Sequence, residues 1–403
     1  MLTPPVILVV LLAIATYALI SRKLASSILS LPMVFTGFGL LLGQIGAQIV
    51  SMETGRQEVH LITEITLILV LFADASRVNL ASLRSSIAIP ERMLLIGMPL
   101  SILFGTIIAR WVSPDQPWAL AFLLSAILTP TDAALGQSVV TSPAVPKRIS
   151  QSINVESGLN DGIALPIVLI AAIMSAATSG AQGEGVPENI ALFTCLQLIL
   201  GPVAGIVVGY LSAKLLDLAV SRKTVTMAEQ GLYFLATAFI AYYSAELIGG
   251  NGFIAAFVGG LTFGNTLPAP PMFINEFMES EGQLLTMLTF LVFGSLLAPI
   301  GLTHASWRTL TLAISFLSVV RVAAIWLALI GMKLSSYEKL FLGWFGPRGL
   351  ASILFVLLVL EEFPIPGEDE LIACVVLTVL FSIVLHGVSA VPLSNLFSRK
   401  SAR

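Results

Sequence analysis

The chain alternates between long apolar runs and short polar stretches. A helix needs about 20 apolar residues to cross a bilayer, and runs of that length recur along the whole sequence. Because the polar stretches between them are short, the pattern predicts an all-α polytopic membrane protein without a separate water-exposed domain. About 13 transmembrane helices are expected, near residues 4–21, 27–50, 59–76, 93–112, 117–140, 153–178, 190–213, 228–247, 249–267, 283–301, 309–331, 337–360 and 371–393.

The placement of basic residues supports this count. Fifteen of the 20 Lys and Arg residues follow odd-numbered spans, three follow even-numbered spans, and two lie inside spans. Cytoplasmic loops carry the excess of Lys and Arg, so we expect a cell-membrane protein with its N-terminus outside and its C-terminus in the cytoplasm. The first apolar run precedes Arg22 and Lys23, whereas the basic residues of a cleaved signal peptide come first. We therefore interpret this run as the first span.

Composition agrees with a chain embedded in membrane lipid. It is 57% hydrophobic and 11% charged, with a mean hydropathy of +0.96, whereas soluble domains carry about 25% charged residues. Cys195 and Cys374 fall in apolar segments and the three histidines are scattered, so neither a disulfide nor a metal-ligand spacing is present. We predict no cofactor and no nucleic-acid partner.

Two spans carry a proline in the middle of an apolar run. Span 5 contains TPTD at residues 129–132, and span 12 contains GPRG at residues 346–349. Span 12 is the seventh span after span 5, and the glycine-rich span 9 is the seventh after span 2. Because seven is odd, the two members of each pair run in opposite directions. This pattern predicts an inverted repeat with two broken helices that cross near the midplane, as in many transporters. Backbone groups freed by the prolines would line a cavity there.

Acidic residues occur where apolar ones are expected. Asp132 and Asp161 lie inside apolar spans, and because a charge at the bilayer centre costs about 2.5–3.5 kcal/mol, such residues mark ion or proton pathways. Ser157 shares a helix face with Asp161 four residues later, and Asn160 neighbours that face. With the Thr131 hydroxyl they form a set of hard oxygen donors that suits a small alkali cation. A buried carboxylate can hold either a proton or a cation, which is the basis of exchange.

Glu156 is expected to have a structural role. It lies five residues before Asp161 and points away from it on a helix. A buried glutamate needs a partner, and we expect Arg321 in that place, with Arg348 as the alternative. Asp74 lies near the cytoplasmic end of span 3, where it either pairs with Arg77 or lines an entry funnel for cations.

These residues match signatures of a known family. The chain resembles, over essentially its whole length, the monovalent cation:proton antiporter-1 family, which includes NhaP-type prokaryotic antiporters and the animal sodium/proton exchangers. The matching elements are Thr131-Asp132, the ESGLND stretch at 156–161, the GPRG stretch at 346–349, Arg321, and LFADA at 71–75.

The resemblance implies a domain organisation. A homodimer is expected, in which a dimerisation domain (approximately residues 1–50 and 190–267) carries a mobile ion-binding core (approximately 59–178 and 283–393). The core would move in an elevator-like manner to expose the site alternately to each side.

The resemblance also implies the ligands and the stoichiometry. Asp161, Asp132, Ser157 and the Thr131 backbone would coordinate the cation, Na⁺ or Li⁺, and the Asn-Asp pair implies electroneutral exchange of one cation for one proton. Ala133 departs from the family, which more often has proline after the Thr-Asp pair.

Several alternatives remain at the sequence level. A K⁺/H⁺ antiporter would use the same fold, because cation selectivity depends on cavity dimensions. An intramembrane aspartyl protease would share a proton between paired carboxylates, but it needs Tyr-Asp and Gly-x-Gly-Asp motifs, and this chain has Thr-Asp and Leu-Asn-Asp instead. A channel would need a continuous pore, which a proton-coupled buried carboxylate argues against. We therefore predict a transporter and not an enzyme.

Overall fold

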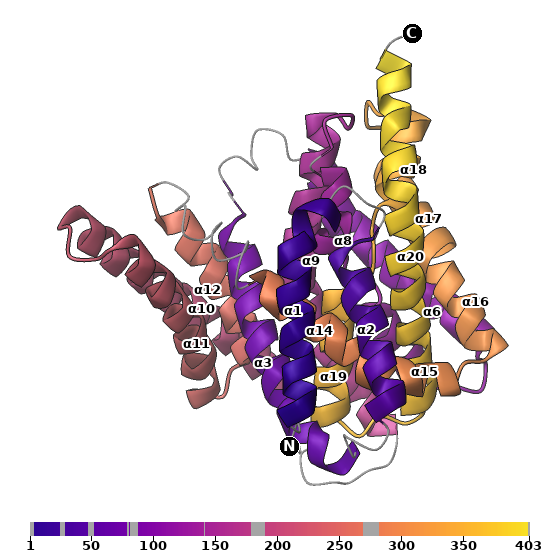
Figure 1. Cartoon of the computed structure of the whole chain (residues 1–403), viewed down its shortest axis with the longest axis horizontal. Coiled ribbons are helices and arrows are strands. Elements are labelled where there is room, and N and C mark those ends of the chain that lie inside the picture. Colours follow the sequence, from indigo (N-terminus) through magenta and orange to yellow (C-terminus); the bar gives the residue numbers. More distant parts are fainter. Residues whose placement is uncertain are drawn as a thin grey trace.

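The computed structural model spans the chain and describes residues 4–24, 29–46, 52–78, 80, 88–140, 142–178, 190–268 and 282–401. Every regular element in these ranges is a helix (Figure 1). With η marking a π-helical turn, the elements are α1 (Pro4–Leu24), α2 (Leu31–Gly46), α3 (Met52–Ser76), α5 (Ala88–Arg92), η1 (Met93–Gly97), α6 (Met98–Val112), α7 (Trp118–Ile127), α8 (Ala133–Val140), α9 (Lys147–Thr178), α10 (Ile190–Ser221), α11 (Met227–Leu247), α12 (Gly252–Thr266), α14 (Gln283–Val292), η3 (Phe293–Leu297), α15 (Ala298–Thr303), α16 (Trp307–Ser315), η4 (Phe316–Val320), α17 (Arg321–Ala328), α18 (Ser336–Trp344), α19 (Leu350–Glu362) and α20 (Glu368–Ser401).

Helix length and apolar composition identify a multi-pass membrane protein. Among the described residues, six helical stretches are long and apolar enough to cross a bilayer. They are Ala88–Val112, Lys147–Thr178, Cys195–Ser221, Gln283–Thr303, Trp307–Ala328 and Glu368–Phe397. The all-helical class predicted from the sequence is therefore confirmed, while the total of about 13 spans stays a prediction.

Among the elements given above, three are π-helical turns within longer helical stretches, and two of them precede a proline. Pro99 follows η1 and Pro299 follows η3, each as the second residue of the next α-helix. Proline lacks an N–H group and its ring crowds the preceding turn, so a wider turn accommodates it. The third, η4, ends directly before Arg321, and such turns occur frequently at functional sites.

α12 is held between α10 and α3 by closely approaching glycines. A Cβ at Gly205 of α10 would lie 2.6 Å from the carbonyl oxygen of Ala255, and a Cβ at Gly260 of α12 would lie 2.1 Å from that of Phe72. Small residues let membrane helices approach in this way. α3, which the sequence assigns to the ion-binding core, thus packs closely on α12, which belongs to the predicted dimerisation domain.

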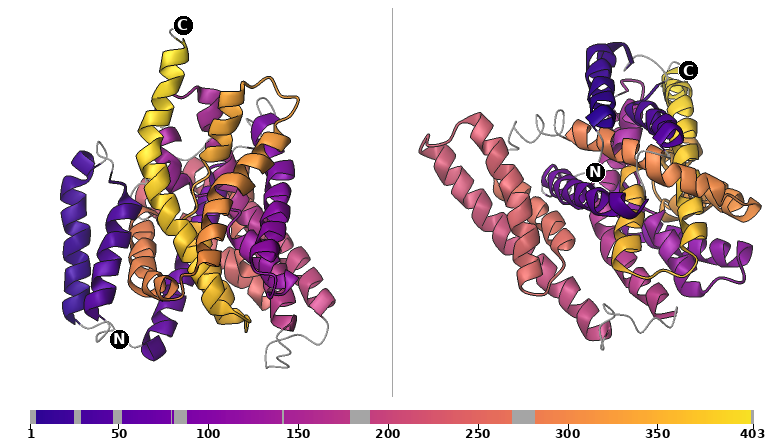
Figure 2. Two further views of the ribbon diagram at one scale, coloured as in Figure 1. Left: turned by 90° about the vertical axis from the view of Figure 1, so that its right-hand side faces the viewer. Right: turned by 60° about the horizontal axis from the view of Figure 1, so that its bottom comes forward.

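α10 and α11 form a pair that extends to one side of the bundle (Figure 2). Their outer surface is apolar, and large side chains of α10 are about half exposed or more. Apolar surface of this extent is expected to face lipid or another protein. The exposed residues of α10 include Ile199, Ile206, Tyr210, Leu211 and Leu215.

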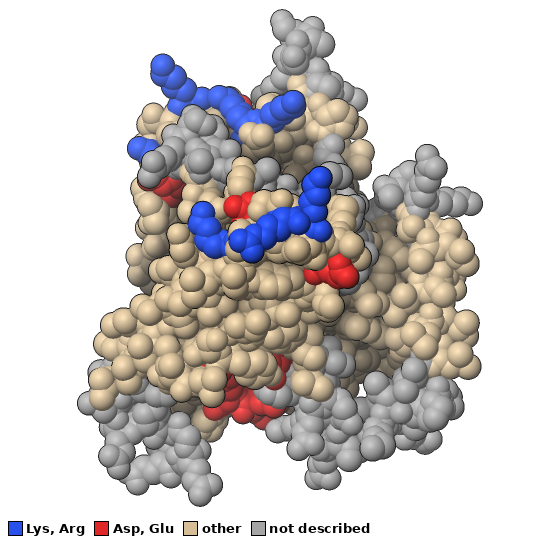
Figure 3. Space-filling model, turned by 90° about the vertical axis from the view of Figure 1, so that its left-hand side faces the viewer, with Lys and Arg blue, Asp and Glu red and all other residues tan. Residues whose placement is uncertain are grey.

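Charge is unevenly distributed between the two ends of the molecule. On the face shown in Figure 3, Lys and Arg side chains occur in the upper half, and the lower end carries acidic side chains. The C-terminus lies at the upper end and the N-terminus at the lower end (Figure 1). This distribution agrees with the charge pattern that predicts a cytoplasmic C-terminus, although Arg84 and other basic residues of that pattern lie outside the described residues.

Polar contacts join the helix ends that the sequence places outside. The Ser113 hydroxyl donates to Glu370 Oε1 at 2.7 Å, which ties the end of α6 to the start of α20. Arg308 donates to Asp115 Oδ1 at 2.7 Å, and this guanidinium lowers the pKa of Asp115. Asp115 is exposed, so we expect the pair to orient the loop and to contribute little to stability.

Candidate functional site

Two helices are interrupted at the prolines singled out in the sequence. α7 ends at Ile127 and α8 begins at Ala133, while α18 ends at Trp344 and α19 begins at Leu350. The non-helical segments meet, because the Asp132 N–H donates to the Pro347 carbonyl at 2.7 Å. Residues 128–132 and 345–349, hereafter the first and second interruptions, therefore lie against each other inside the bundle. Of Ala133, the structure describes only the backbone, as the first residue of α8.

Each interruption supplies a charged side chain to the other. Arg348 donates through Nη1 to the carbonyls of Thr129 and Pro130, just beyond the C-terminus of α7. Asp132 accepts the Leu350 N–H at 2.7 Å, at the N-terminus of α19. A cation near a helix C-terminus and an anion near a helix N-terminus are both stabilising. This exchange satisfies backbone groups that would otherwise be unpaired in a buried site.

Glu156 and Arg321 form a bidentate ion pair. Nη1 and Nη2 of Arg321 each donate to one carboxylate oxygen of Glu156 at 2.8 Å. The exposed fractions of the two residues are 2% and 3%, so this is a buried pair with good geometry. Arg348, the alternative partner, is engaged with backbone carbonyls instead, because the second interruption directs it toward the end of α7.

The predicted donor residues converge around the first interruption. The hydroxyls of Thr131 and Ser157 lie 3.0 Å apart, and Asn160 donates through Nδ2 to Thr131 Oγ1 at 2.6 Å. Thr131, Ser157 and Asn160 are buried, whereas Asp161 is half-buried. Asp132 lies one residue from Thr131, and its charge is close enough to that of Asp161 to interact with it. The structure thus brings these five residues together at one place in the bundle.

Two oxygens of this cluster are buried without a hydrogen-bond donor. They are Oδ1 of Asn160 and Oδ1 of Asp161. Burying an acceptor without a partner costs about 1–3 kcal/mol, and more for a charged group, and such atoms are rare in native proteins. A cation or a proton would satisfy them. The arrangement can therefore hold either, with Asp161 as the carboxylate.

Asp74 lies beside the same helix. The Cα of Gly158 on α9 faces the Asp74 backbone, since a Cβ there would lie 3.9 Å from the Asp74 carbonyl oxygen. Asp74 is half-buried, and its charge interacts with that of Asp161. The ion pairs among the described residues do not include one between Asp74 and Arg77. Arg77 lies past the end of α3 and is exposed, and it acts on Asp74 through its charge without a direct ion pair.

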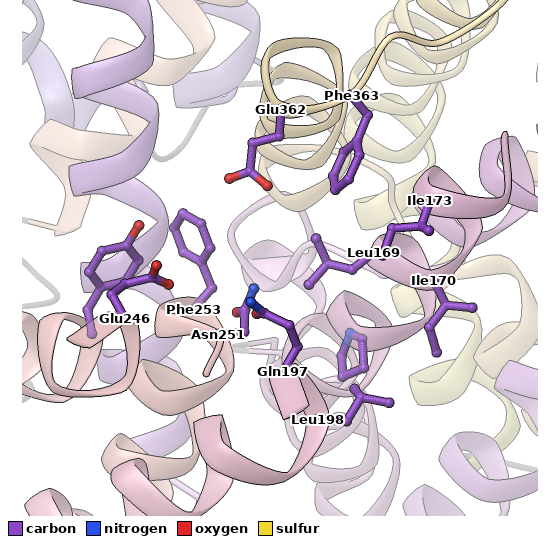
Figure 4. A pocket seen from close by; sticks show the side chains of 12 residues that line it. Leu169, Ile170, Ile173, Gln197, Leu198, Glu246, Asn251, Phe253, Glu362 and Phe363 are labelled. Carbon is purple, nitrogen blue, oxygen red and sulfur yellow. The ribbon is translucent and has the colours of Figure 1, made fainter. Parts of the chain in front are cut away.

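A separate cavity of about 340 Å³ lies further along α9 (Figure 4). Glu246 and Glu362 contribute carboxylates to its lining, and the Gln197 amide oxygen is buried there without a partner. The closest lining residue to the cluster along α9 is Pro166, more than one helical turn after Asp161. The cavity is therefore not the oxygen cluster itself. Its position between α9, α10, α11, α12 and α19 was not predicted, because no local motif marks it.

Other residues around the interruptions were also missed from the sequence. Ser352 of α19 donates to the carbonyl of Ile127, the last residue of α7, at 2.9 Å. Ser382 of α20 contacts the second interruption at Arg348, and His386 contacts the carbonyl of Trp344 directly before it. A lone serine or histidine in an apolar run gives no signal by itself, since its partner is fixed by tertiary packing. The intramembrane position of His386 was the single hint available.

Comparison with known proteins places the chain in context. The family profile described as "Sodium/hydrogen exchanger, transmembrane" matches residues 7–396. The Na(+)/H(+) antiporter NhaH of Halobacillus dabanensis is 30% identical over 300 residues, which cover 73% of this chain and 72% of that protein. The K(+)/H(+) antiporter NhaP2 of Shewanella sp. (strain ANA-3) is 26% identical over 374 residues. That match covers 90% of this chain and 62% of the relative, so the chain spans less than two thirds of its length. Both relatives are named as transporters, not enzymes.

The fold has a solved counterpart. The sodium proton antiporter MjNhaP1 from Methanocaldococcus jannaschii, determined at pH 8, superimposes with a TM-score of 0.76 at 20% sequence identity. The match covers 98% of each chain. The arrangement of helices described above is therefore that of a known antiporter fold.

Proposed function

Because the chain belongs to the sodium/hydrogen exchanger family, we propose that it is a secondary antiporter that exchanges a monovalent cation for protons across the membrane. The observation that carries this proposal is the buried, unpartnered Oδ1 of Asp161 beside the oxygens of Ser157 and Asn160. A carboxylate in this position needs either a proton or a cation, and competition between the two couples their fluxes.

The hydrogen bonds around Thr131 support a cation set. Asn160 donates to Thr131 Oγ1, so the Thr131 hydrogen is free to point to Ser157 Oγ at 3.0 Å. In this arrangement a lone pair of Ser157, Oδ1 of Asn160 and the carboxylate of Asp161 remain as acceptors. We propose Asp161, Ser157, Asp132 and Thr131 as the cation ligands.

Alternating access would expose this cluster first to one side and then to the other. The cavity beside Glu246 and Glu362 supports an entrance from the outside, and the half-buried Asp74 supports an approach from the cytoplasm. We retain the predicted two-domain organisation, the homodimer, the inverted repeat of about 13 spans and the cytoplasmic C-terminus as parts of this proposal. The close packing of α3 on α12 supports one change to the predicted organisation, in which α3 joins the stationary part instead of the core.

The cation and the stoichiometry are the finer part of the proposal. One exchangeable carboxylate, Asp161, next to the neutral Asn160 supports electroneutral exchange of one cation for one proton. We propose Na⁺ or Li⁺ as the cation. K⁺ is the second candidate, which is favoured by the naming of the NhaP2 relatives as K⁺/H⁺ antiporters.

Proton flux in proteoliposomes tests the function. An imposed pH gradient would be followed with Na⁺, Li⁺ and K⁺ in turn, with the membrane potential clamped and then released. The expected result is a proton flux with Na⁺ or Li⁺ that does not depend on the membrane potential. A flux with K⁺ alone would instead favour the second candidate, K⁺/H⁺ exchange. A folded preparation without any cation-dependent flux would refute the proposal.

A further inference from the structure

One of the helical hydrogen bonds that the second interruption lacks is the bond between Arg348 and Trp344. In an unbroken helix the Arg348 N–H would donate to the carbonyl four residues earlier, that of Trp344. Instead, the Arg348 N–H donates to Ser382 Oγ at 2.6 Å, and the Trp344 carbonyl lies 2.9 Å from His386 Nε2. Two side chains of α20 thus bind the two groups that would otherwise bond to each other, and the Trp344 carbonyl also accepts the Gly346 N–H at 2.8 Å.

The hydrogen-bond partners fix the orientation of each proton. The Trp344 carbonyl can only accept, so His386 Nε2 carries the hydrogen. In the neutral ring Nδ1 is then an acceptor, and the Ser382 hydroxyl at 3.2 Å is the donor available to it, because the Ser382 carbonyl at 3.0 Å is also an acceptor. Ser382 Oγ accepts from Arg348 and donates to His386, and His386 donates to Trp344, which makes one continuous chain of bonds.

This chain of bonds is buried and anchored. The exposed fraction is 0% for Ser382 and 2% for His386, so an unpaired group here would carry the full cost of desolvation. Trp344 is held on α20 a second time, since its indole Nε1 donates to Ser389 Oγ at 3.0 Å and its ring lies 5.3 Å from that of His386. The end of α18 is therefore fixed to α20 on the side of the interruption.

We propose that Ser382 and His386 are positioning residues for transport, because they hold the second interruption open. The proposal rests on the function proposed above. While the Trp344–Arg348 bond stays open, Pro347 accepts the Asp132 N–H, and the Arg348 side chain reaches Thr129 and Pro130. Ser382 and His386 thus set the position of the first interruption, to which the proposed cation ligand Thr131 belongs. They do so without touching the cation itself.

Substitutions on α20 test the proposal by separating apparent affinity from folding. Ser382→Ala and His386→Leu each remove one residue of the chain and the two hydrogen bonds that it makes there, and His386→Gln keeps an N–H that can reach Trp344. Thr378→Val is the matched control, because Thr378 is equally buried on α20 and its hydroxyl donates only to the Cys374 carbonyl of its own helix. Proteoliposome flux would give the apparent KM for the cation, and gel filtration and the thermal midpoint would report folding.

Ser382→Ala and His386→Leu should raise the apparent KM about three- to tenfold, because part of the free energy of the lost hydrogen bonds is felt at the cation site. Thr378→Val should leave it unchanged, and His386→Gln should recover most of the loss. An unchanged KM in Ser382→Ala, or an equal rise in Thr378→Val, would overturn the proposal.

A readout that does not depend on transport keeps failure of this proposal separate from failure of the proposed function. Amide hydrogen exchange of peptides that cover residues 344–350 should be faster in Ser382→Ala and His386→Leu than in the wild type and Thr378→Val. If the wild type shows no cation-dependent flux, the antiporter proposal fails on that result. Unchanged amide hydrogen exchange in both variants would then also refute the proposal that Ser382 and His386 hold the second interruption open.

Discussion

Among single side chains, Asp161 carries the strongest prediction. Asp161→Asn removes the exchangeable proton and the negative charge while it keeps nearly the same shape. We expect cation-dependent proton flux to be abolished in proteoliposomes, with the protein still folded by gel filtration. Asp217→Asn makes the same chemical change on α10, away from the cluster, and should transport like the wild type. Flux that survives in Asp161→Asn would exclude this carboxylate as the site of competition.

The pair Glu156–Arg321 carries a different prediction, because it concerns stability. Removing one partner of a buried ion pair leaves an uncompensated charge and costs about 3–5 kcal/mol, so Glu156→Leu and Arg321→Met should each lower the thermal midpoint strongly. The double variant should be more stable than the sum of the single losses predicts, since no unpaired charge remains. Additive losses would show that the two groups act independently, in contradiction to the two 2.8 Å contacts.

At the scale of elements, a glycine permits the close contact between the two interrupted helices. A Cβ at Gly349 would lie 2.1 Å from Asp132 Oδ2, so Gly349→Ala should displace the carboxylate from the Leu350 N–H and reduce transport severely. Gly136→Ala is a control at the same site, because the one described atom within 4 Å of its Cβ is Pro347 Cγ at 3.9 Å. Alanine is also favoured over glycine inside a helix by about 1 kcal/mol. Proteoliposome flux that is equal in both variants would contradict the role of this contact.

The sequence predicts these elements better than it predicts their connections. Proline and charge inside apolar runs are strong local signals, and they indicated both interruptions and the residues around Asp161. They also favoured Arg321 over Arg348 as the partner of Glu156. They could not show that Arg348 reaches the carbonyls of Thr129 and Pro130. Such a bond depends on how far two distant segments approach, which is decided by packing and not by local composition.

The same limit applies to the π-helical turns and to the cavity. A proline in an apolar run signals an irregularity, yet the sequence does not distinguish a break, as at Pro347, from a wider turn, as before Pro99 and Pro299. The outcome depends on whether neighbouring groups can satisfy the freed backbone. At Pro347 they do, because Asp132 and α20 supply the partners. The cavity of Figure 4 is a product of five converging helices, none of which carries a distinguishing motif.

For the protein as a whole, the question is which side reaches Asp161. Phe257 of α12 packs flat on Gly162 of α9, since a Cβ at Gly162 would lie 2.0 Å from the Phe257 ring. Phe253, one turn before Phe257, and Pro166, one turn after Gly162, line the cavity of Figure 4. The Phe257–Gly162 contact therefore lies between that cavity and Asp161. If that cavity faces outward, as the proposed orientation has it, we expect this state to be closed toward the outside, with Asp161 reached from the Asp74 side.

Thiol labelling tests this state directly. In a Cys195→Ser background, which removes the exposed cysteine, Asp161→Cys should react with a membrane-impermeant reagent faster from the cytoplasmic side of oriented vesicles than from the outside. Adding Phe257→Ala should open the outer layer and raise labelling from the outside. Phe263→Ala should not, because Phe263 is buried on the same helix against Phe72 and Phe234. Equal labelling from both sides before Phe257 is changed would mean that this aromatic contact is not the barrier, and that access is controlled by another part of the bundle.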